Sequence, residues 1–254
     1  IRTVVSKQKD ELQQWILSEL SKQSIPVLEA DQEMVVSRED SDSSKDRTTA
    51  DWNLLWKDGK RLQIDGGSLI SMPWFECLRT SMTAYEALYP DAMSHRKESL
   101  ETLKSVRLPA RLEFRKNVPW RENHFKELIL DGGHNADALE ALAHQLDQWQ
   151  IRDCVMIFGM SRDKLELELV PALKQVIGFS ALLIACPFRS PRSAKAKELC
   201  GFLRSQMDPS NLPNMEPVSN VEEALECTLR YPKSPVVIFG SFYLAGEVMT
   251  LLDE

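Results

Sequence analysis

The chain has 254 residues, of which 43% are hydrophobic and 27% are charged, the balance of an ordinary globular protein. Its formal net charge of -7 at pH 7 argues against broad binding to nucleic acid or to an anionic membrane, because both require clustered Lys and Arg. No apolar run approaches the roughly 20 residues that span a bilayer. We therefore expect an intracellular protein, of the cytosol or an organelle matrix such as the mitochondrion, without nucleic-acid or membrane partners.

The cysteines and histidines give no sign of a metal site. The five cysteines lie far apart and form no Cys-x-x-Cys pair, and the histidines show no ligand spacing with them. An odd number of scattered cysteines favours buried free thiols in a reducing compartment. The cysteines are Cys77, Cys154, Cys186, Cys200 and Cys227.

The first 106 residues are expected to form a small, incomplete α/β segment. A strand at 3–5, a helix at 11–20 and a short strand at 25–28 have the order of a βαβ unit. Residues 37–51 contain almost nothing apolar, so we expect an exposed or disordered loop there.

Two further elements are predicted before residue 106. Residues 52–64 have two β-rich arms around Asp58-Gly59, a dipeptide typical of hairpin turns. Residues 74–88 have helical spacing and are followed by Pro90, which ends a helix. The face that this helix is expected to bury carries Phe75, Leu78, Met82, Tyr85 and Leu88.

The second part of the chain, 107–254, has a regular alternation of apolar strands and amphipathic helices. Strands are predicted at 128–130, 154–158, 181–186, 216–218 and 236–239, and helices at 136–149, 165–177, 193–205, 221–230 and 243–252. This alternation predicts an α/β fold with a Rossmann-like, mostly parallel sheet that has helices on both faces. The extended stretch around Pro109 is expected to be the linker that enters this domain.

Polar chemistry is concentrated where the strand at 128–130 meets the helix at 136–149. Asp131, His134 and Asn135 lie within five residues, separated by two glycines that permit a tight turn. Ligands of α/β proteins usually bind at such carboxyl ends of strands, where a helix N-terminus adds partial positive charge. The alternative is that Asp131 and Asn135 merely cap the helix and that His134 lies on the surface.

The sequence Leu-Asp-Gly-Gly-His-Asn at 130–135, preceded by Leu-Pro-Ala-Arg-Leu-Glu at 108–113, closely resembles the Mur ligase superfamily. Within it, the segment is most similar to folylpolyglutamate synthase and dihydrofolate synthase. Leu108 stands where those enzymes usually have Trp. The resemblance implies that 107–254 is the carboxyl-terminal domain of such a ligase and that 1–106 is the tail of its central ATPase-type domain.

The same resemblance implies roles for four of these residues. Arg111 would approach the nucleotide, and Asp131 would contact the nucleotide ribose. Asn135 and His134 would line the same cleft. Apart from the resemblance, no general base is evident in the sequence, and His134 is the one candidate for a catalytic base.

Two more strand ends carry candidate contacts for the amino-acid substrate. Residues 158–164 read Phe-Gly-Met-Ser-Arg-Asp-Lys, and by resemblance Lys164 would meet the carboxylate of the incoming amino acid. Residues 238–246 resemble the terminal strand, Gly-Ser and helix of the family, which makes Ser241 a second contact. The alternatives are a solvated loop at Lys164 and a plain helix cap at Ser241.

The activity that the resemblance implies is an ATP-dependent joining of glutamate to a folate or pteroate through an acyl phosphate, with ATP and Mg²⁺ required. It would place the protein in folate and one-carbon metabolism. No Gly-x-x-x-x-Gly-Lys-Ser/Thr loop occurs in the chain, and residues 74–82 differ from the Gly-x-His-Gln-x-x-Asn motif of relatives. The chain also starts without Met. We therefore expect it to supply the ribose- and glutamate-binding half, with the phosphate loop and the Mg²⁺ ligands in a missing segment or another chain.

Two other interpretations stay open. A ligase-like domain that serves as a non-catalytic scaffold or accessory subunit would also explain the missing loop. An unrelated dinucleotide-binding domain is a weaker alternative, because no Gly-x-Gly-x-x-Gly follows a strand. The choice between folylpolyglutamate and dihydrofolate synthase activity is also open.

Overall fold

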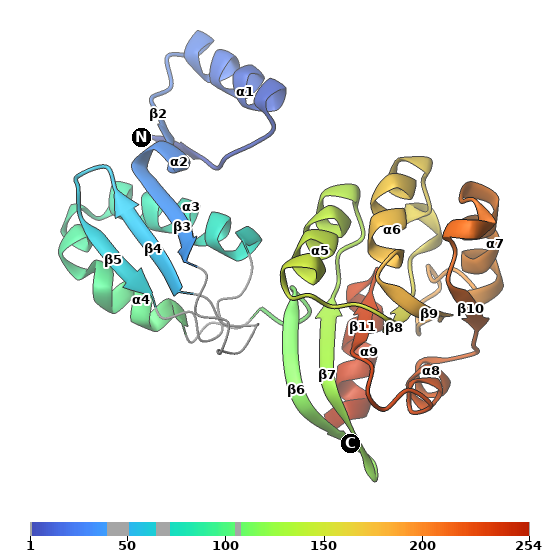
Figure 1. Ribbon diagram of the computed structural model, residues 1–254. Helices are drawn as coiled ribbons and strands as arrows, with labels where there is room; N and C mark the ends of the chain where they lie inside the picture. The colour runs from blue at the N-terminus through green and yellow to red at the C-terminus, as the bar shows by residue number, and fades with distance from the viewer. Residues whose placement is uncertain (1, 40–50, 65–71, 105–107, 254) are drawn as a thin grey trace. The chain divides into compact units, whose positions relative to one another are not determined.

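The computed structural model describes residues 2–39, 51–64, 72–104 and 108–253 (Figure 1). The chain divides into two compact units, residues 1–107 (unit 1) and 108–254 (unit 2). The division lies one residue after the predicted domain boundary. In the described ranges, no helix combines the length and the apolar composition that a membrane crossing needs.

Unit 1 begins with a βαβ unit, as the sequence predicts. The strands β1 (Thr3–Val5) and β2 (Val27–Glu29) pair in parallel and are connected by α1 (Asp10–Lys22). Acidic residues in the first turn of α1 and Lys22 in its last turn complement the helix dipole. The helix buries none of its residues.

A three-stranded antiparallel sheet follows, consisting of β3 (Met34–Glu39), β4 (Asp51–Trp56) and β5 (Arg61–Ile64), after the short helix α2 (Ala30–Glu33). The predicted hairpin is confirmed, and Gly59 has φ +86° in its turn. The predicted loop at 37–51 is wrong at both ends, because residues 37–39 belong to β3 and β4 begins at residue 51. Residues 37–39 are polar, but pairing with β4 satisfies their backbone hydrogen bonds, which the local sequence does not show. The rest of the predicted loop, residues 40–50, lies outside the described ranges.

The helical part of unit 1 contains α3 (Met72–Leu88), the 3-10 helix η1 (Pro90–His95) and α4 (Arg96–Lys104), of which only α3 was predicted. The predicted apolar face of α3 is buried only in part, since Tyr85 is 45% and Leu88 73% exposed. The buried core of unit 1 contains Met34, Trp52, Leu54, Trp56, Phe75, Leu78, Met82 and Leu100.

Unit 2 is built on a six-stranded sheet in the order β10-β9-β8-β11-β7-β6. All neighbouring strands are parallel except β6 and β7, which confirms the mostly parallel α/β fold. The strands are β6 (Glu113–Trp120), β7 (Asn123–Asp131), β8 (Cys154–Phe158), β9 (Ser180–Ala185), β10 (Asn214–Pro217) and β11 (Val236–Phe239). After the predicted linker around Pro109, the edge strand β6, which the sequence did not predict, starts at Glu113.

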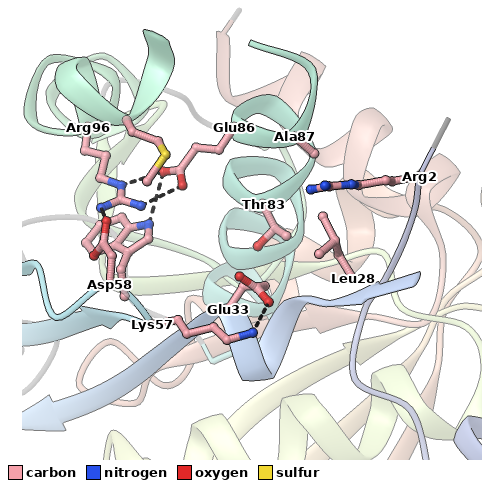
Figure 2. Close-up of a pocket in the computed structure, with 11 residues that line it drawn as sticks. Arg2, Leu28, Glu33, Lys57, Asp58, Thr83, Glu86, Ala87 and Arg96 are labelled. Atoms are coloured by element: carbon pink, nitrogen blue, oxygen red, sulfur yellow. Dashed lines mark hydrogen bonds and ion pairs between the residues drawn. The ribbon is translucent and has the colours of Figure 1, made fainter. Parts of the chain in front are cut away.

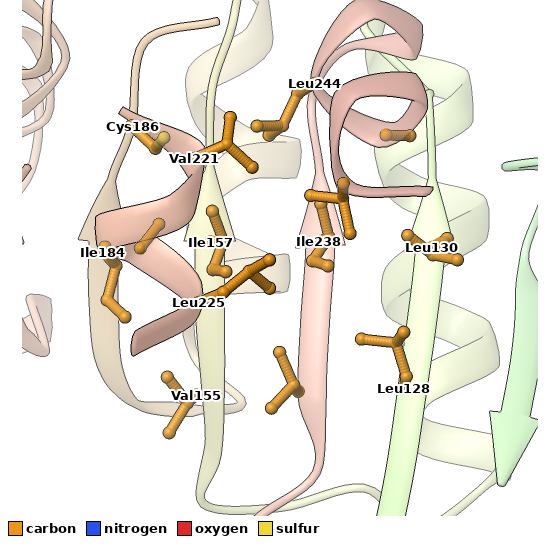
Figure 3. Packing of buried hydrophobic residues seen from close by; sticks show 14 of the residues in the cluster. Leu128, Leu130, Val155, Ile157, Ile184, Cys186, Val221, Leu225, Ile238 and Leu244 are labelled. Atoms are coloured by element: carbon orange, nitrogen blue, oxygen red, sulfur yellow. The ribbon is translucent and has the colours of Figure 1, made fainter. Parts of the chain in front are cut away.

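Helices cover both faces of this sheet (Figure 1). Figure 3 shows α8 and α9 packed on one face, where Leu225 and Leu244 lie over Ile157 and Ile238. The right-handed connections of parallel strands place α5, α6 and α7 on the other face. The helices are α5 (Ala136–Gln148), α6 (Val170–Ile177), α7 (Ala196–Gln206), α8 (Val221–Thr228) and α9 (Phe242–Asp253), with 3-10 turns η2 (Arg162–Lys164), η3 (Leu167–Leu169) and η4 (Pro209–Asn211).

Two helices start later than the sequence predicts. The helix predicted from residue 165 begins at Val170, since Pro171 favours the first turn and two 3-10 turns precede it. The helix predicted from residue 193 begins at Ala196, because Ser193 instead forms a β-bridge with Ser161. Both differences fall in the loops at the strand ends where ligands were expected.

The five cysteines are all free thiols, but only three are buried. Cys77 is exposed and Cys227 half-buried, so the expectation of burial is wrong for these two. Burial raises the pKa of the Cys154 thiol to about 12 and also raises the pKa of Cys186. Both stay protonated thiols at neutral pH and act as packing residues.

Candidate functional site

The strand ends of unit 2 form a single edge. The register pairs Phe239 of β11 with Asp131 of β7 on one side and with Phe158 of β8 on the other, and Phe158 with Ala185 of β9. Four neighbouring parallel strands therefore end at the same level. Crevices at the carboxyl ends of parallel strands are the usual ligand sites of this fold class, so we refer to this region as the strand-end site.

Two turns at this edge require glycine for different reasons. Gly240 has φ +100°, and a Cβ there would lie 2.7 Å from the carbonyl oxygen of Gly159. A Cβ on Gly132 would lie 2.3 Å from a ring carbon of Phe242. The turns after β7 and β11 are thus packed too closely for any side chain at these two positions.

Asp131 is buried at this edge, with an exposed fraction of 5%. Its Oδ1 accepts a hydrogen bond from the Gly133 N–H at 2.8 Å, and its Oδ2 accepts one from the Leu112 N–H at 2.9 Å. Burial raises the pKa of Asp131, while the two backbone donors and the nearby Arg111 act in the opposite direction. The Asp131 carboxylate therefore links the end of β7 to the segment before β6 by a hydrogen bond. The predicted contact of Asp131 with a nucleotide ribose stays a prediction.

The segment before β6 contains two non-glycine residues whose backbone is in the left-handed region, Ala110 with φ 55° and Leu112 with φ 49°. The N–H of Gly132 donates to the carbonyl oxygen of Ala110 at 2.7 Å, and the Ala110 N–H donates to Glu113 Oε2 at 2.9 Å. Such conformations cost on the order of 1 kcal/mol each and persist where surrounding contacts impose them. Arg111 lies between the two and is exposed.

Phe242 is a site residue that the sequence interpretation missed. The Cζ atom of Arg111 lies 4.4 Å from the centre of its ring, and the His134 ring meets it edge-on with centroids 6.1 Å apart. The signal was an aromatic residue directly after the Gly-Ser turn of β11. One ring thus joins the segment before β6, the turn after β7 and the start of α9.

His134 and Asn135 follow that turn. Nδ1 of His134 lies 3.0 Å from the carbonyl oxygen of Gly132, so in the neutral ring Nδ1 carries the proton and Nε2 keeps its lone pair. Asn135 is the N-cap of α5, and its Oδ1 accepts from the Ala138 N–H at 2.9 Å. The capping alternative therefore holds for Asn135, and its contact with a ligand stays a prediction.

Lys164 and Ser241 lie at the ends of the neighbouring strands β8 and β11. Lys164 is half-buried in η2, and no described residue forms an ion pair with its ammonium group. Ser241 is 4% exposed, and its Oγ accepts from the Tyr243 N–H at 3.1 Å. Next to Lys164, Asp163 forms an ion pair with Arg192 at 2.6 Å, and the charges of both Arg192 and Lys164 help to lower the pKa of Asp163.

The structure therefore places the six predicted residues along one edge of the sheet, but only some of them are in contact with one another. Arg111 and His134 contact the same ring, and Asp131 and Asn135 flank that His in the turn after β7. Ser241 directly precedes Phe242 in sequence. No hydrogen bond or ion pair between described residues links Lys164 to the others, so its convergence on a shared ligand stays a prediction.

A second polar region lies in unit 1, beside a cavity of about 330 Å³ (Figure 2). Arg96, whose side chain is 5% exposed, donates to both carboxylate oxygens of Glu86 at 2.7 and 2.8 Å and to Asp58 at 2.6 Å. Its guanidinium lies 4.6 Å from the ring centre of Trp56, which also donates to Glu86 at 3.1 Å. These groups satisfy one another, which is typical of a structural charge cluster.

Comparison with known proteins places the strand-end site in context. Residues 110–242, just over half of the chain, match the family described as Mur ligase, glutamate ligase domain. A probable bifunctional folylpolyglutamate synthase/dihydropteroate synthase of Haloferax volcanii is 28% identical over 150 residues, which are 58% of this chain and 16% of that protein.

Two solved structures share the fold. The folylpolyglutamate synthase of Mycobacterium tuberculosis, complexed with ADP and AMPPCP, has a TM-score of 0.74 and 18% identity over 99% of this chain and 55% of its own. The bifunctional folylpolyglutamate synthase/dihydrofolate synthase of Yersinia pestis, complexed with AMPPNP and a Mn ion, has a TM-score of 0.66 and 20% identity over 95% of this chain and 51% of its own. The chain thus spans about half the length of these structures. By its sequence match over residues 110–242, the chain belongs to the Mur ligase family and carries that family's glutamate ligase domain in unit 2.

Proposed function

We propose that the chain supplies the ribose- and glutamate-binding half of an ATP-dependent carboxylate–amine ligase of the folylpolyglutamate synthase/dihydrofolate synthase type. The observation that carries this proposal is the strand-end site. There the guanidinium of Arg111 and the imidazole of His134 both pack against the ring of Phe242, next to the end of β7. The family match and the names of the relatives support the reaction class. The site would work in an intracellular compartment, cytosol or organelle matrix, that contains ATP and folates.

The nucleotide would bind at the end of β7. Arg111 is exposed and forms no ion pair with a described residue, although Asp131 lies near enough to interact with its charge, so its guanidinium N–H groups are available to phosphate or ribose oxygens. Asp131 holds the turn in place through two backbone N–H groups and keeps further lone pairs on its oxygens for a ribose hydroxyl. Asn135 would contribute its exposed amide N–H groups.

The glutamate would bind at the ends of β8 and β11. A half-buried ammonium without an ion-pair partner, as at Lys164, favours a carboxylate ligand because partial burial reduces the screening of its charge. Ser241 lies at the start of α9, where the helix dipole adds a preference for an anion.

The reaction would proceed in two steps. A folate or pteroate carboxylate oxygen attacks the γ-phosphorus of ATP, the bond to the β–γ bridging oxygen breaks, and ADP leaves an acyl phosphate. The amine of glutamate then attacks the acyl carbon, and inorganic phosphate leaves as the amide forms. His134 could accept the proton that the amine loses, since its Nε2 is the free acceptor. Holding both reactants at one sheet edge would make the attack effectively intramolecular.

The phosphate loop and the Mg²⁺ ligands of this proposal lie outside the described residues. Within those residues, no three His, Cys, Asp or Glu side chains lie close enough together to hold a metal ion. We therefore assign no step to a metal bound by this chain. A segment or a partner chain with the phosphate loop would supply both.

The test is ATP-dependent addition of glutamate to a folate by the complete enzyme. We expect Lys164→Ala to raise the apparent KM for glutamate severalfold while the KM for ATP stays within a factor of two. Lys126→Ala is the matched control, because Lys126 is an exposed lysine of the same unit in the first half of β7.

Two outcomes would count against this proposal. Equal changes in both KM values would indicate that Lys164 is structural. A complete protein that binds nucleotide but ligates no glutamate to either folate or pteroate would favour the non-catalytic scaffold.

A further inference from the structure

Phe242 contacts two of the predicted site residues, Arg111 and His134, and also lies against Gly132. It is the first residue of α9, yet its ring lies against the turn after β7. Three ring atoms, Cδ1, Cε1 and Cγ, occupy the space at 2.3 to 2.5 Å from where a Cβ of Gly132 would be. The ring is therefore packed directly onto the backbone of that turn.

The other contacts of the ring are to groups with chemistry of their own. The guanidinium carbon of Arg111 lies 4.4 Å from the ring centre, within the range of a cation–π interaction. The His134 ring approaches at an interplanar angle of 80°, the edge-to-face arrangement that aromatic pairs prefer. A residue that merely filled space over Gly132 would need neither contact.

Because Arg111 packs on an aromatic ring and not on a carboxylate, its positive charge is not neutralised by that partner. A carboxylate that held Arg111 would neutralise it and occupy its donors, as Glu86 and Asp58 do for Arg96. An aromatic ring orients a cation through its quadrupole but accepts no strong hydrogen bonds. The Arg111 N–H groups and most of its charge thus stay available to an anionic ligand.

We propose that Phe242 is a positioning residue, which packs against His134 and holds Arg111 in the orientation that binds the nucleotide. This inference rests on the proposed function, because it assumes that a nucleotide is the ligand at the end of β7. Phe242 acts through Arg111 and does not itself bind the phosphates. Its removal changes nucleotide affinity more than glutamate affinity.

The experiment compares Phe242→Leu, Phe242→Tyr and the control Phe125→Leu in the complete enzyme, with ADP binding measured by calorimetry. Phe125 is a buried aromatic of the same unit in the first half of β7 and stacks on Trp120. We expect Phe242→Leu to weaken ADP binding about two- to fivefold, the effect of losing one exposed cation–π contact. Phe242→Tyr keeps the ring and should stay within twofold, as should Phe125→Leu.

A double-mutant cycle tests whether the ring acts through Arg111. In an Arg111→Ala background, Phe242→Leu should cause little further loss of ADP affinity, because the contact is already absent. The KM for glutamate should stay within twofold in Phe242→Leu. The proposal is overturned if Phe242→Leu has no effect, if it weakens binding equally in both backgrounds, or if Tyr fails to replace Phe.

A spectroscopic measurement separates this inference from the proposed function. The Nε–H resonance of Arg111 should carry a ring-current shift in the unaltered protein and lose it in Phe242→Leu but not in Phe242→Tyr. If the unaltered enzyme binds no nucleotide, the proposed function fails, and this resonance alone decides whether Phe242 orients the guanidinium. An Arg111 resonance that is identical in Phe242→Leu overturns the positioning role even where nucleotide binds.

Discussion

Arg96 in unit 1 and Arg111 in unit 2 both lie on an aromatic ring, yet their surroundings are opposite. Arg96 is buried between Glu86 and Asp58, which accept from three of its nitrogens. Arg111 is exposed on Phe242, and no carboxylate among the described residues forms an ion pair with it. The difference teaches that an arginine whose donors are used within the protein serves stability, whereas one held only by a ring is available to a ligand.

A third arginine separates the effect of burial from the effect of its partners. Arg121 also lies on a tryptophan, Trp120, at 4.8 Å, and pairs with two carboxylates, those of Glu222 and Glu226. Its side chain is 50% exposed, against 5% for Arg96. Arg96 and Arg121 thus have the same kinds of partner, one tryptophan ring and two carboxylates, and differ mainly in how far their side chains are exposed to water.

The largest effect is expected from Arg96→Met. The substitution leaves the Glu86 carboxylate, which is 13% exposed, without its cation, and unpaired buried charges cost about 3–5 kcal/mol. The free energy of unfolding of unit 1 can be measured from hydrogen exchange of the β4 backbone amides at a series of urea concentrations. A loss below about 1 kcal/mol would show that the cluster contributes little.

Arg121→Met is the matched control for that change. Because exposed ion pairs are screened by water and their side chains lose entropy on pairing, we expect little or no shift in the melting temperature. A shift as large as that of Arg96→Met would contradict the view that burial decides the effect.

Asp131→Ala should have the next largest effect, about 1–3 kcal/mol on the stability of unit 2, because the buried N–H groups of Leu112 and Gly133 lose their acceptor. Asp137→Ala, an exposed acid at the start of α5, is the control. Weaker nucleotide binding with unchanged stability would assign Asp131 to the ligand rather than to the turn.

The pH dependence of stability offers a smaller and more specific test. Because burial raises the folded pKa of Asp131 above 3.8, its contribution to stability is fully present below the unfolded value and is lost as the pH rises through the folded one. The stability difference between the unaltered protein and Asp131→Asn should therefore shrink as the pH rises across this window. Urea unfolding at a series of pH values measures it, and a difference that grows with pH would reverse the sign of our argument.

Arg111→Met should change stability least, by less than about 0.5 kcal/mol, as is usual for exposed positions. Nucleotide affinity should nevertheless fall. A calorimetric titration with ADP together with thermal unfolding distinguishes the two. A marked loss of stability would place Arg111 with Arg96 among the structural cations.

The sequence predicted the junction of β7 and α5 well, because an apolar run, two glycines and a 3.6-residue periodicity all indicate the same local structure. It did not predict β6, whose pairing with β7 supplies hydrogen bonds that no local pattern shows. It also missed the left-handed conformations of Ala110 and Leu112, since neither residue type favours them. The role of Phe242 depends on contacts across more than a hundred residues, which a single sequence does not show.

The double attachment of residues 110–112 also determines which part of the chain carries Arg111. Since Asp131 and Gly132 bind this segment from β7, the guanidinium is an integral part of unit 2, although it stands near the point where the chain enters that unit. Arg111, His134 and Phe242 therefore belong to one group within unit 2, and their mutual geometry is set by the backbone of that unit rather than by the segment that precedes it.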